Sequence, residues 1–387
     1  MHMMGQEEIQ EVAKVITSRQ FMRYRGGENG YIDRFEKDLC EKIGVKHALT
    51  VNSGTSALIC ALVGLGLGPG DEVIVPAFTW VATAVAVLAV GAVPVLAEVD
   101  ESLMIDPADI ERKISRYTKA IIPVHMSNQV CNLDAIMRIA RKHRLVVCED
   151  CCQAVGLTYK GRRVGSIGHA NAFSFNQFKN ITCGEGGAIL TSNDRAYERA
   201  RIYHDSGSYT RAGASKIKEP FFVGQNYRAN EIMGAMLGVQ LGRLDGILRN
   251  LRARRAVLAE ILSKSKRFQL GRHNDPADAV ALTIQFSNGD EAKHFVAQQR
   301  GSVSRAIDSG IHVYTNWQPV LAQGVFHPKM NPYAWAKRKI RYAADMCPRT
   351  LEILERTCQV SFAYNLPMPE VRALGKRLCN GSSTAER

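Results

Sequence analysis

Short apolar runs alternate with longer helical patterns between residues 45 and 192 of the chain. Most of these runs show little alternation of apolar and polar positions, which is typical of strands buried on both faces of a parallel sheet. The seven runs cover residues 47–51, 73–75, 93–97, 120–124, 145–148, 172–175 and 188–190. The clearest helical patterns cover residues 56–67, 79–90 and 133–143. The alternation predicts an α/β fold with a mostly parallel seven-stranded sheet between helices, which would bind a ligand beyond the carboxyl ends of its strands.

A long helical pattern follows, from residue 230 to about 264, with Leu and Ile at three- and four-residue spacings. We expect this helix to join a large domain to a smaller one, because residues 279–286 and 302–313 indicate an α+β arrangement. The predicted units are an N-terminal segment (1–24), a large domain (25–245), a smaller C-terminal α+β domain (246–379) and a polar, disordered tail (380–387).

The composition is that of an ordinary globular protein, since 46% of the 387 residues are hydrophobic and 22% are charged. One apolar stretch, residues 77–97, is long enough to span a bilayer. Gly91 and Pro94 interrupt it, so we interpret it as a buried helix followed by a buried strand. Residues 1–20 lack the apolar core of a secretory signal, and the ten cysteines are expected to be reduced. The sequence therefore predicts a cytoplasmic protein without a membrane role.

The charge of the chain favours anionic partners. Its 50 Lys and Arg residues outnumber its 37 Asp and Glu residues, which gives a net charge of +13. The basic residues are scattered, with no run of five, and no zinc-finger spacing or RNP-like aromatic motif is present. We therefore favour a small anionic ligand over nucleic acid.

Cys148, Cys151 and Cys152 form a cluster that raises the question of a metal site. No second cysteine pair or histidine pair follows at the spacing of a zinc site. We therefore expect no metal.

The segment 52–57 follows a predicted strand and opens a predicted helix. Gly54 allows a tight turn, and the first N–H groups of a helix have no partner within the helix, so this turn suits a phosphate. The alternative is a plain helix cap by Ser53 or Thr55. Both interpretations remain open on these residues alone.

Asp150 stands at the carboxyl end of the predicted strand 145–148. A buried carboxylate is costly unless it is paired. It is therefore either the partner of a cationic ring nitrogen or a helix cap at the strand exit.

Lys179 follows an aromatic-rich segment, 173–178, and precedes a glycine-rich turn at 184–187. A lysine in apolar surroundings can form a Schiff base with a carbonyl group. The alternative is an ordinary solvated loop lysine.

The order and spacing of these segments resemble those of the sugar aminotransferases of the DegT/DnrJ/StrS type, which are pyridoxal-phosphate (PLP) enzymes of aminotransferase fold type I. The matching segments are residues 53–58, 76–83, 123–125, 149–154, 173–179 and 224–228. The resemblance runs from about residue 24 to 245 and more loosely to the C-terminus.

The resemblance implies catalytic roles for Lys179 and Asp150 and cofactor contacts for eight residues. Lys179 would hold the cofactor covalently, Asp150 would pair with the pyridine nitrogen, Gln153 would lie near the ring hydroxyl and Trp80 would stack on the ring. Thr55, Ser56 and Ser174 would bind the phosphate, and Asn226 would reach it from a neighbouring subunit. An obligate homodimer with shared active sites follows from the last of these assignments.

The resemblance also implies a reaction in amino-sugar biosynthesis, in which an amino group passes from an amino acid, expected to be L-glutamate, to a keto or aldehyde sugar. Pyridoxamine phosphate would be the intermediate form of the cofactor. Lys179 argues against a dehydratase of the same fold, in which a histidine replaces this lysine. The complete set of site residues argues against a non-catalytic regulatory homologue.

Two stretches depart from the family pattern, residues 126–129 and 310–317, so the acceptor is not expected to be a standard nucleotide sugar. Residues 182–187 and 21–24 are similar to a subgroup that aminates an eight-carbon keto-sugar acid, such as an oxidised octulosonate. The basic residues Arg211, Lys216 and Lys218 would either hold an anionic acceptor or form a solvated loop.

Overall fold

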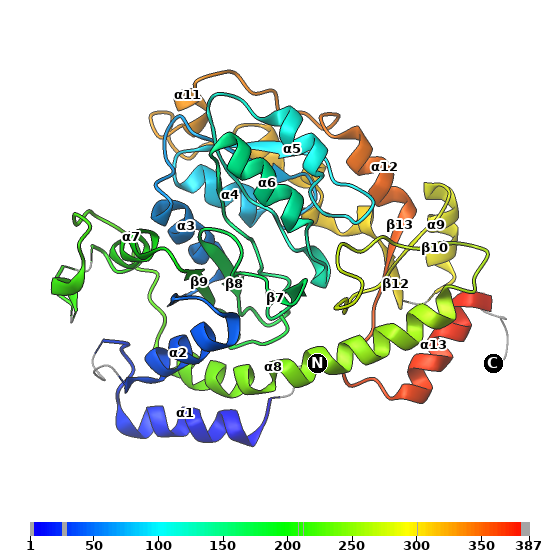
Figure 1. The fold of residues 1–387 in the computed structure, drawn as a ribbon, viewed down its shortest axis with the longest axis horizontal. Helices are drawn as coiled ribbons and strands as arrows, with labels where there is room; N and C mark the ends of the chain where they lie inside the picture. Colours follow the sequence, from blue (N-terminus) through cyan, green and yellow to red (C-terminus); the bar gives the residue numbers. More distant parts are fainter. Residues whose placement is uncertain (1–3, 25–28, 208, 212, 300, 381–387) are drawn as a thin grey trace.

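The computed structural model describes residues 4–24, 29–207, 209–211, 213–299 and 301–380. The predicted tail, apart from Asn380, lies outside the described residues. Two hydrophobic cores organise the chain, a large one around a central sheet and a smaller one near the C-terminus. Figure 1 shows the two regions side by side, with one long helix running beneath both.

The central sheet is formed by seven strands: β1 (His47–Val51), β2 (Glu72–Pro76), β3 (Val93–Ala97), β4 (Thr118–Ile121), β5 (Val146–Val147), β8 (Asn171–Ser174) and β9 (Gly187–Thr191). Strands β3, β2, β4 and β5 pair in parallel, whereas β1 and β8 both pair antiparallel with β9. Asp150 forms parallel bridges to Val124 and to Ala172 and so joins the two groups. The order β3-β2-β4-β5-β8-β9-β1 confirms the predicted mostly parallel sheet.

Strand β4 ends three residues earlier than predicted, and strand β5 covers only two residues. Pro123 has no N–H to contribute to the ladder, which interrupts regular pairing at this point. The pairing resumes beyond it, because the N–H of Asp150 donates to the carbonyl of Pro123 at 2.9 Å. The irregular stretch thus still carries Asp150 across the middle of the sheet.

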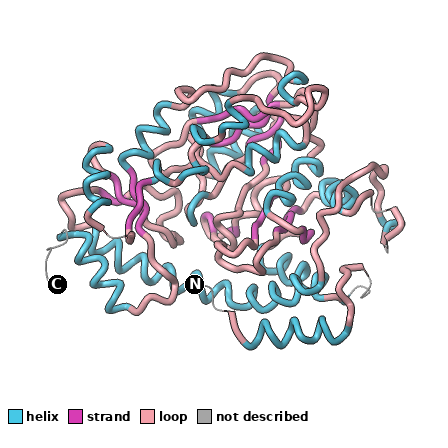
Figure 2. The backbone as a smooth tube through the Cα atoms, turned by 180° about the vertical axis from the view of Figure 1, so that it is seen from behind, coloured by secondary structure: helices cyan, strands magenta, loops and turns pink. Residues whose placement is uncertain are grey.

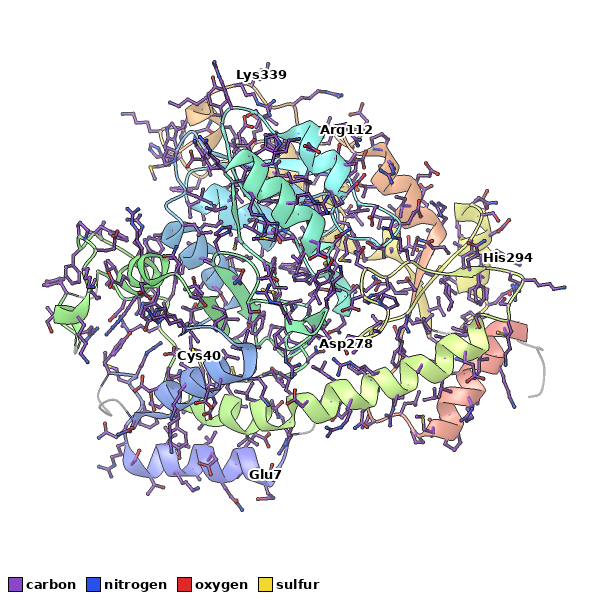
Figure 3. All side chains as sticks on the ribbon, in the orientation of Figure 1. Glu7, Cys40, Arg112, Asp278, His294 and Lys339 are labelled. Atoms are coloured by element: carbon purple, nitrogen blue, oxygen red, sulfur yellow. The ribbon has the colours of Figure 1, made fainter. Side chains whose placement is uncertain are left out.

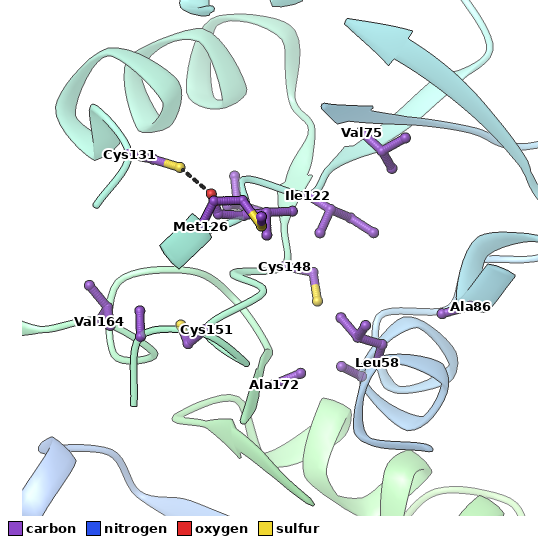
Figure 4. Close-up of a cluster of buried hydrophobic side chains, with 14 of the residues drawn as sticks. Leu58, Val75, Ala86, Ile122, Met126, Cys131, Cys148, Cys151, Val164 and Ala172 are labelled. Carbon is purple, nitrogen blue, oxygen red and sulfur yellow. Dashed lines mark hydrogen bonds between the residues drawn. The ribbon is translucent and has the colours of Figure 1, made fainter. Parts of the chain in front are cut away.

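The sheet lies among helices, as Figure 2 shows from behind. These are α1 (Gln6–Ser18), α2 (Tyr31–Ile43), α3 (Gly54–Gly64), α4 (Ala82–Ala89), α5 (Pro107–Lys113), α6 (Leu133–His143) and α7 (Asp194–His204). Helix α3 is buried on nearly all sides, between the sheet and helices α4 and α7. Helix α6 is amphipathic and buries only one face. The core between α3 and the sheet includes Leu58, Val75 and Cys148 (Figure 4).

Helix α8 (Glu231–Leu262) confirms the predicted long helix and connects the two cores. Leu237, Leu241 and Leu244 pack in the large core, and Leu258 and Leu262 pack in the smaller one. The connection places the two regions along one rod of 32 residues.

The smaller core is covered by an antiparallel sheet of β10 (Gln269–Leu270), β11 (Thr283–Gln285), β13 (Thr357–Val360) and β12 (Val303–Arg305). Helices α9 (Gly289–Ala297), α12 (Pro348–Arg356) and α13 (Met368–Asn380) accompany this sheet. The arrangement is the α+β type expected for this part of the chain. The predicted domain boundaries stay predictions.

The segment 306–354 leaves the smaller sheet and packs its apolar side chains in the large core. It contains short helical turns, among them η5 (Gly310–His312), η6 (Tyr314–Asn316), α10 (Gln318–Leu321) and α11 (Pro332–Trp335). Tyr314 and Trp317 are its largest buried side chains. This segment reaches the carboxyl ends of the central strands, where Phe78 bridges to Val313.

Candidate active site

A cavity of about 660 Å³ opens at the carboxyl ends of the central strands. It is lined by six of the eight predicted cofactor residues: Thr55, Trp80, Asp150, Gln153, Ser174 and Lys179. The other two, Ser56 and Asn226, do not line it within this chain. The structure therefore gathers these side chains from four of the matching segments around one space.

The turn before helix α3 forms one end of the cavity. Ser53 caps the helix, because its Oγ accepts a hydrogen bond from the N–H of Ser56 at 3.1 Å. Ser56 turns its hydroxyl to Asn52 Oδ1 at 2.7 Å, so its side chain is engaged behind the turn. The capping interpretation is thus correct for Ser53, which lines the cavity together with Gly54 and Thr55.

Gly54 makes this turn possible because no side chain fits there. A Cβ at Gly54 would lie 2.7 Å from Cβ of Ser174 and 3.1 Å from Sγ of Cys152. A Cβ at Gly187, on β9, would lie 2.3 Å from the carbonyl oxygen of Ser53. The close approach creates a cradle of main-chain N–H groups and hydroxyls at the start of a buried helix, which suits a phosphate group.

Asp150 is only 4% exposed and its carboxylate faces the cavity. Its Oδ2 accepts a hydrogen bond from Thr83 Oγ1 at 2.8 Å, and its Oδ1 accepts one from the N–H of Cys152 at 3.1 Å. No lysine, arginine or histidine of the described chain forms an ion pair with it. A buried carboxylate that is held by neutral donors and aimed into a cavity fits a ligand that brings a positive charge.

Lys179 reaches the cavity from the loop that follows β8. Its N–H donates to the carbonyl of Asn176 at 2.9 Å, which closes a tight turn. The next residue anchors the loop, because Asn180 Nδ2 donates to Asn128 Oδ1 at 2.8 Å and to the carbonyl of Val155 at 3.1 Å. The amine is half-buried and stands in the same space as Asp150.

The rest of the lining includes residues that the sequence did not identify as site residues: Thr79, Thr83, Ser127, Asn128, Asn180 and His312. His312 packs edge-on against Trp80, with ring centroids 5.2 Å apart. Ser127, Asn128 and His312 belong to the stretches that depart from the family pattern. That departure was the one signal in the sequence that marked them.

Asn226 lies outside the cavity of its own chain. It bridges to Asp205, and Asp205 is held by Arg211 at 2.8 Å and by Arg228. Neither Arg211 nor Lys216 nor Lys218 lines the cavity of this chain. Their roles toward a neighbouring subunit or an anionic acceptor stay predictions.

The structure contains a buried group of possible metal ligands, because His125, Glu149 and Cys151 offer ligand atoms close together. It differs from the cysteine cluster considered in the sequence. The predicted trio shares only Cys151 with it. The carboxylate of Glu149 already accepts hydrogen bonds from the N–H groups of Gly165, Ile167 and Gly168. His125 Nδ1 accepts from the N–H of Cys131 at 3.1 Å, so its Nε2 carries the proton toward Glu149. His125 and Glu149 therefore form a satisfied hydrogen-bond network, and burial raises the pKa of the Cys151 thiol, which opposes the thiolate form that a metal would bind.

Within the described residues, no helix is both long and apolar enough to cross a membrane. This agrees with the interpretation of residues 77–97 as α4 and β3. The expected cytoplasmic location stays a prediction.

Several curated proteins are similar to parts of this chain. GDP-perosamine synthase of Caulobacter vibrioides is 44% identical over 218 residues, which is 56% of this chain and 57% of that protein. The spore coat polysaccharide biosynthesis protein SpsC of Bacillus subtilis is 43% identical over 52% of this chain and 50% of its own length. A putative L-glutamine:3-amino-2,3-dideoxy-scyllo-inosose aminotransferase of Micromonospora echinospora is 39% identical over 67% of this chain and 61% of its length. The chain thus spans about half to three fifths of these relatives.

Solved structures match nearly the whole chain. DesV of S. venezuelae has a TM-score of 0.80 and 28% identity, with 98% of this chain and 95% of DesV covered. 3-Amino-5-hydroxybenzoic acid synthase has a TM-score of 0.80 and 26% identity, with 97% and 96% covered. These matches confirm aminotransferase fold type I. GDP-4-keto-6-deoxymannose-3-dehydratases share the fold alone, at 18–19% identity.

The sequence profile of one family matches residues 2–366. That range contains the α3 turn, Asp150 and Lys179, and it extends through the segment that contributes His312. With the fold and the profile in agreement, the chain belongs to the DegT/DnrJ/EryC1/StrS aminotransferase family.

Proposed function

We propose that this protein is a PLP-dependent aminotransferase that moves an amino group from L-glutamate to a keto or aldehyde sugar in amino-sugar biosynthesis. The observation that carries the proposal is the convergence of Lys179, the unpaired buried carboxylate of Asp150 and the α3 turn on one cavity. An amine, an anion and a phosphate cradle are the three groups that such a cofactor requires.

The residues present fit this cofactor. Gly54, Thr55 and Ser174 would hold its phosphate, and Asp150 would face the ring nitrogen. Trp80 would cover the ring, and Gln153 would meet its hydroxyl group. When bound, the cofactor supplies a carbonyl carbon for amine exchange and an electron sink for the substrate carbon.

Asp150 would keep the ring nitrogen protonated, because a buried carboxylate is strongly destabilised when it has no positive partner. Thr83 and the N–H of Cys152 hold both carboxylate oxygens in place, so the anion does not have to reorganise. Lys179 would first yield its covalent position to the amine of the donor. Its released amine would then act as the base that moves a proton away from the donor α-carbon.

The acceptor is proposed to be an acidic or phosphorylated keto sugar. The net charge of +13 supports an anionic substrate, and the altered stretches 126–129 and 310–317 both contribute to the cavity wall. The relative named GDP-perosamine synthase matches only 56% of this chain, so we do not include a nucleotide group in the proposed acceptor. Homodimers with shared sites are proposed as well, with Asn226 reaching the partner's phosphate cradle.

The proposal is tested by separate half-reactions of the purified protein. The pyridoxamine-phosphate form is mixed with a panel of neutral, acidic and phosphorylated keto sugars, and the return of the aldehyde form of the cofactor is followed by absorbance. In the other direction, L-glutamate and L-glutamine are compared as donors, because one relative is named for L-glutamine. Failure of every keto sugar to restore the aldehyde form would contradict the proposed activity, and turnover with L-glutamine alone would contradict the proposed donor.

A further inference from the structure

Both stretches that depart from the family pattern meet at one side chain in the cavity, the carboxamide of Gln153. Its Oε1 accepts a hydrogen bond from the N–H of Ser127 at 3.1 Å. Its Nε2 lies 3.2 Å from Nε2 of His312. The turn at Ser127 is further tied to this residue, because the N–H of Asn128 donates to the carbonyl of Gln153 at 2.9 Å. Gln153 is therefore held from both sides by segments that are distant in the sequence.

The direction of each hydrogen bond follows from the groups involved. His312 Nδ1 lies 2.9 Å from the carbonyl oxygen of Ser309, which can only accept, so Nδ1 carries a proton. In a neutral ring, Nε2 is then the acceptor and the amide nitrogen of Gln153 donates to it. The amide oxygen is already used by Ser127, which is consistent with the same orientation. The second N–H of Gln153 meets no acceptor within the described residues.

We propose that neutral His312 is a positioning residue that orients Gln153 so that an N–H donor, rather than the amide oxygen, is available to the cavity. The inference rests on the proposed function, in which this donor would meet the hydroxyl group of the cofactor ring. No sequence motif indicates this role for His312. The role requires the neutral, Nδ1-protonated ring.

Protonation of His312 would remove the acceptor for Gln153. An N–H at Nε2 would then face the N–H2 of the amide, and rotation of the amide would instead place its N–H2 against the N–H of Ser127. Both arrangements set donor against donor, so the orientation is lost in either case. Protonation would therefore weaken cofactor binding.

The surroundings of His312 favour its neutral form, mainly through burial. Burial lowers the pKa of its ring below the ordinary value, and the positive charge of Lys179 acts in the same direction, while the contact with Ser309 opposes them. The other titratable groups that line the cavity, besides Lys179, are Asp150, Glu185 and the partly buried thiol of Cys152, whose pKa burial raises. Protonation of His312 is therefore expected only at a more acidic pH than that of a free histidine.

The first test uses ¹⁵N-histidine NMR on the full-length, cofactor-free protein, with a His312→Gln sample for assignment. We expect the Nδ1-protonated tautomer at pH 7 and a titration midpoint below that of a free histidine. An Nε2-protonated tautomer, or a protonated ring at pH 7, would overturn the proposal. This measurement does not depend on turnover.

The second test measures the affinity for pyridoxal phosphate by equilibrium titration. His312→Leu removes the acceptor and should raise Kd about tenfold, which corresponds to the loss of one hydrogen bond. His312→Gln keeps an acceptor, so it should stay within about threefold of wild type. The wild-type Kd should rise as pH falls through the NMR midpoint, whereas the Kd of His312→Gln should not.

The control is His294→Leu, since Gln298 Nε2 lies 2.8 Å from His294 Nε2 in the same kind of contact, but on the exposed face of α9 (Figure 3). It should leave Kd unchanged. Equal affinity of wild type and folded His312→Leu would refute the role of His312 and leave the proposed function standing. If wild type binds no pyridoxal phosphate, the proposed function fails instead, and the NMR result still decides the tautomer.

Discussion

The two walls of the cavity are built in different ways. The sheet wall, with the α3 turn, Asp150, Ser174 and Lys179, consists of residues at the end of a central strand, a few residues beyond one, or at the start of a helix. We call the part of the lining formed by Thr79, Ser127, Asn128 and His312 the opposite wall. It depends on contacts between remote segments, such as the hydrogen bond of 2.9 Å from the N–H of Thr79 to the carbonyl of His312. One wall is thus fixed by the local order of strand and helix, and the other by tertiary packing.

This difference suggests that one wall serves the reaction and the other serves the choice of substrate. Under the proposed function, the sheet wall would present the groups that hold and activate the cofactor. The opposite wall contains both stretches in which this chain departs from the family pattern, and they meet at Gln153. Changes to the sheet wall should therefore affect the rate most, whereas changes to the opposite wall should affect affinity and substrate choice.

The largest effect is expected for Lys179→Ala. Its loss removes both the covalent attachment and the base, so transamination should fall by about 10⁴-fold, the upper end of what a general base contributes. Borohydride reduction of the wild-type protein, followed by peptide mapping, should place the cofactor on Lys179. Lys142→Ala is the control, because this exposed lysine pairs with Glu111 away from the cavity. A reduced label on another lysine would disprove the assignment.

Asp150→Asn should have the next largest effect. The volume is conserved, but the charge that faces the ring nitrogen disappears, and we expect a loss of about 3–5 kcal/mol in transition-state stabilisation. The readout is kcat/KM, with thermal unfolding to verify that the variant folds. Asp134→Asn, an exposed carboxylate paired with Lys160, is the matched control. Near-normal turnover of Asp150→Asn would remove the proposed role.

The same division explains how far the sequence could predict the molecule. Apolar runs locate buried strands, and a polar residue shortly after such a run is expected near the sheet edge, which made Asp150 and Lys179 candidates. The choice between their alternative roles came from the resemblance to the family, and those roles stay predictions. Strands β4 and β5 are shorter than predicted. The pattern of apolar residues does not show that Pro123 lacks the N–H needed for regular pairing.

His312 and Thr83 could not be found in this way. His312 lies on a short helical turn without periodicity, and it reaches the cavity only because Val313 and Tyr314 are buried against the large core. In the sequence Thr83 looks like an ordinary helical residue, and only the structure shows that its hydroxyl donates a hydrogen bond to Asp150. The contact of Thr83 with Asp150 spans 67 positions and that of His312 with Gln153 spans 159, and contacts between such distant positions leave no recognisable spacing in the sequence.

The shared site would add a third wall from the partner. If Asn226 reaches the phosphate of the neighbouring subunit, Lys179→Ala and Asn226→Ala should each be impaired alone. After subunit exchange, half of the dimers would be mixed and would hold one intact site, so about a quarter of wild-type activity should return. Exchange is verified by native mass spectrometry. No recovery in an exchanged sample would show that each site is complete within one chain.

Gly54→Ala tests the phosphate cradle, and its expected effect is smaller than those above. Its Cβ would lie 2.7 Å from that of Ser174, so the turn has to shift, at a cost of about 1–3 kcal/mol. We expect a comparable loss of affinity for pyridoxal phosphate, measured by titration. The control is Gly246→Ala on α8, where an added Cβ meets nothing within 4 Å. Unchanged affinity in the Gly54 variant would mean that the phosphate binds elsewhere.

The smallest effect is expected from charges outside the cavity. Lys216 and Lys218 are exposed and stand at and just beyond the turn η3 (Ala214–Lys216), so they act on an anionic acceptor only through a field that salt screens. Lys216→Gln/Lys218→Gln should raise KM for an acidic keto sugar by about twofold to fivefold and flatten its dependence on ionic strength. Lys337→Gln/Lys339→Gln provides a control with the same spacing at another exposed site (Figure 3). The affinity for pyridoxal phosphate should stay constant in both, because neither pair lines the cavity. Equal use of neutral and acidic sugars by wild type and variant alike would show that selectivity is set by the walls of the cavity alone.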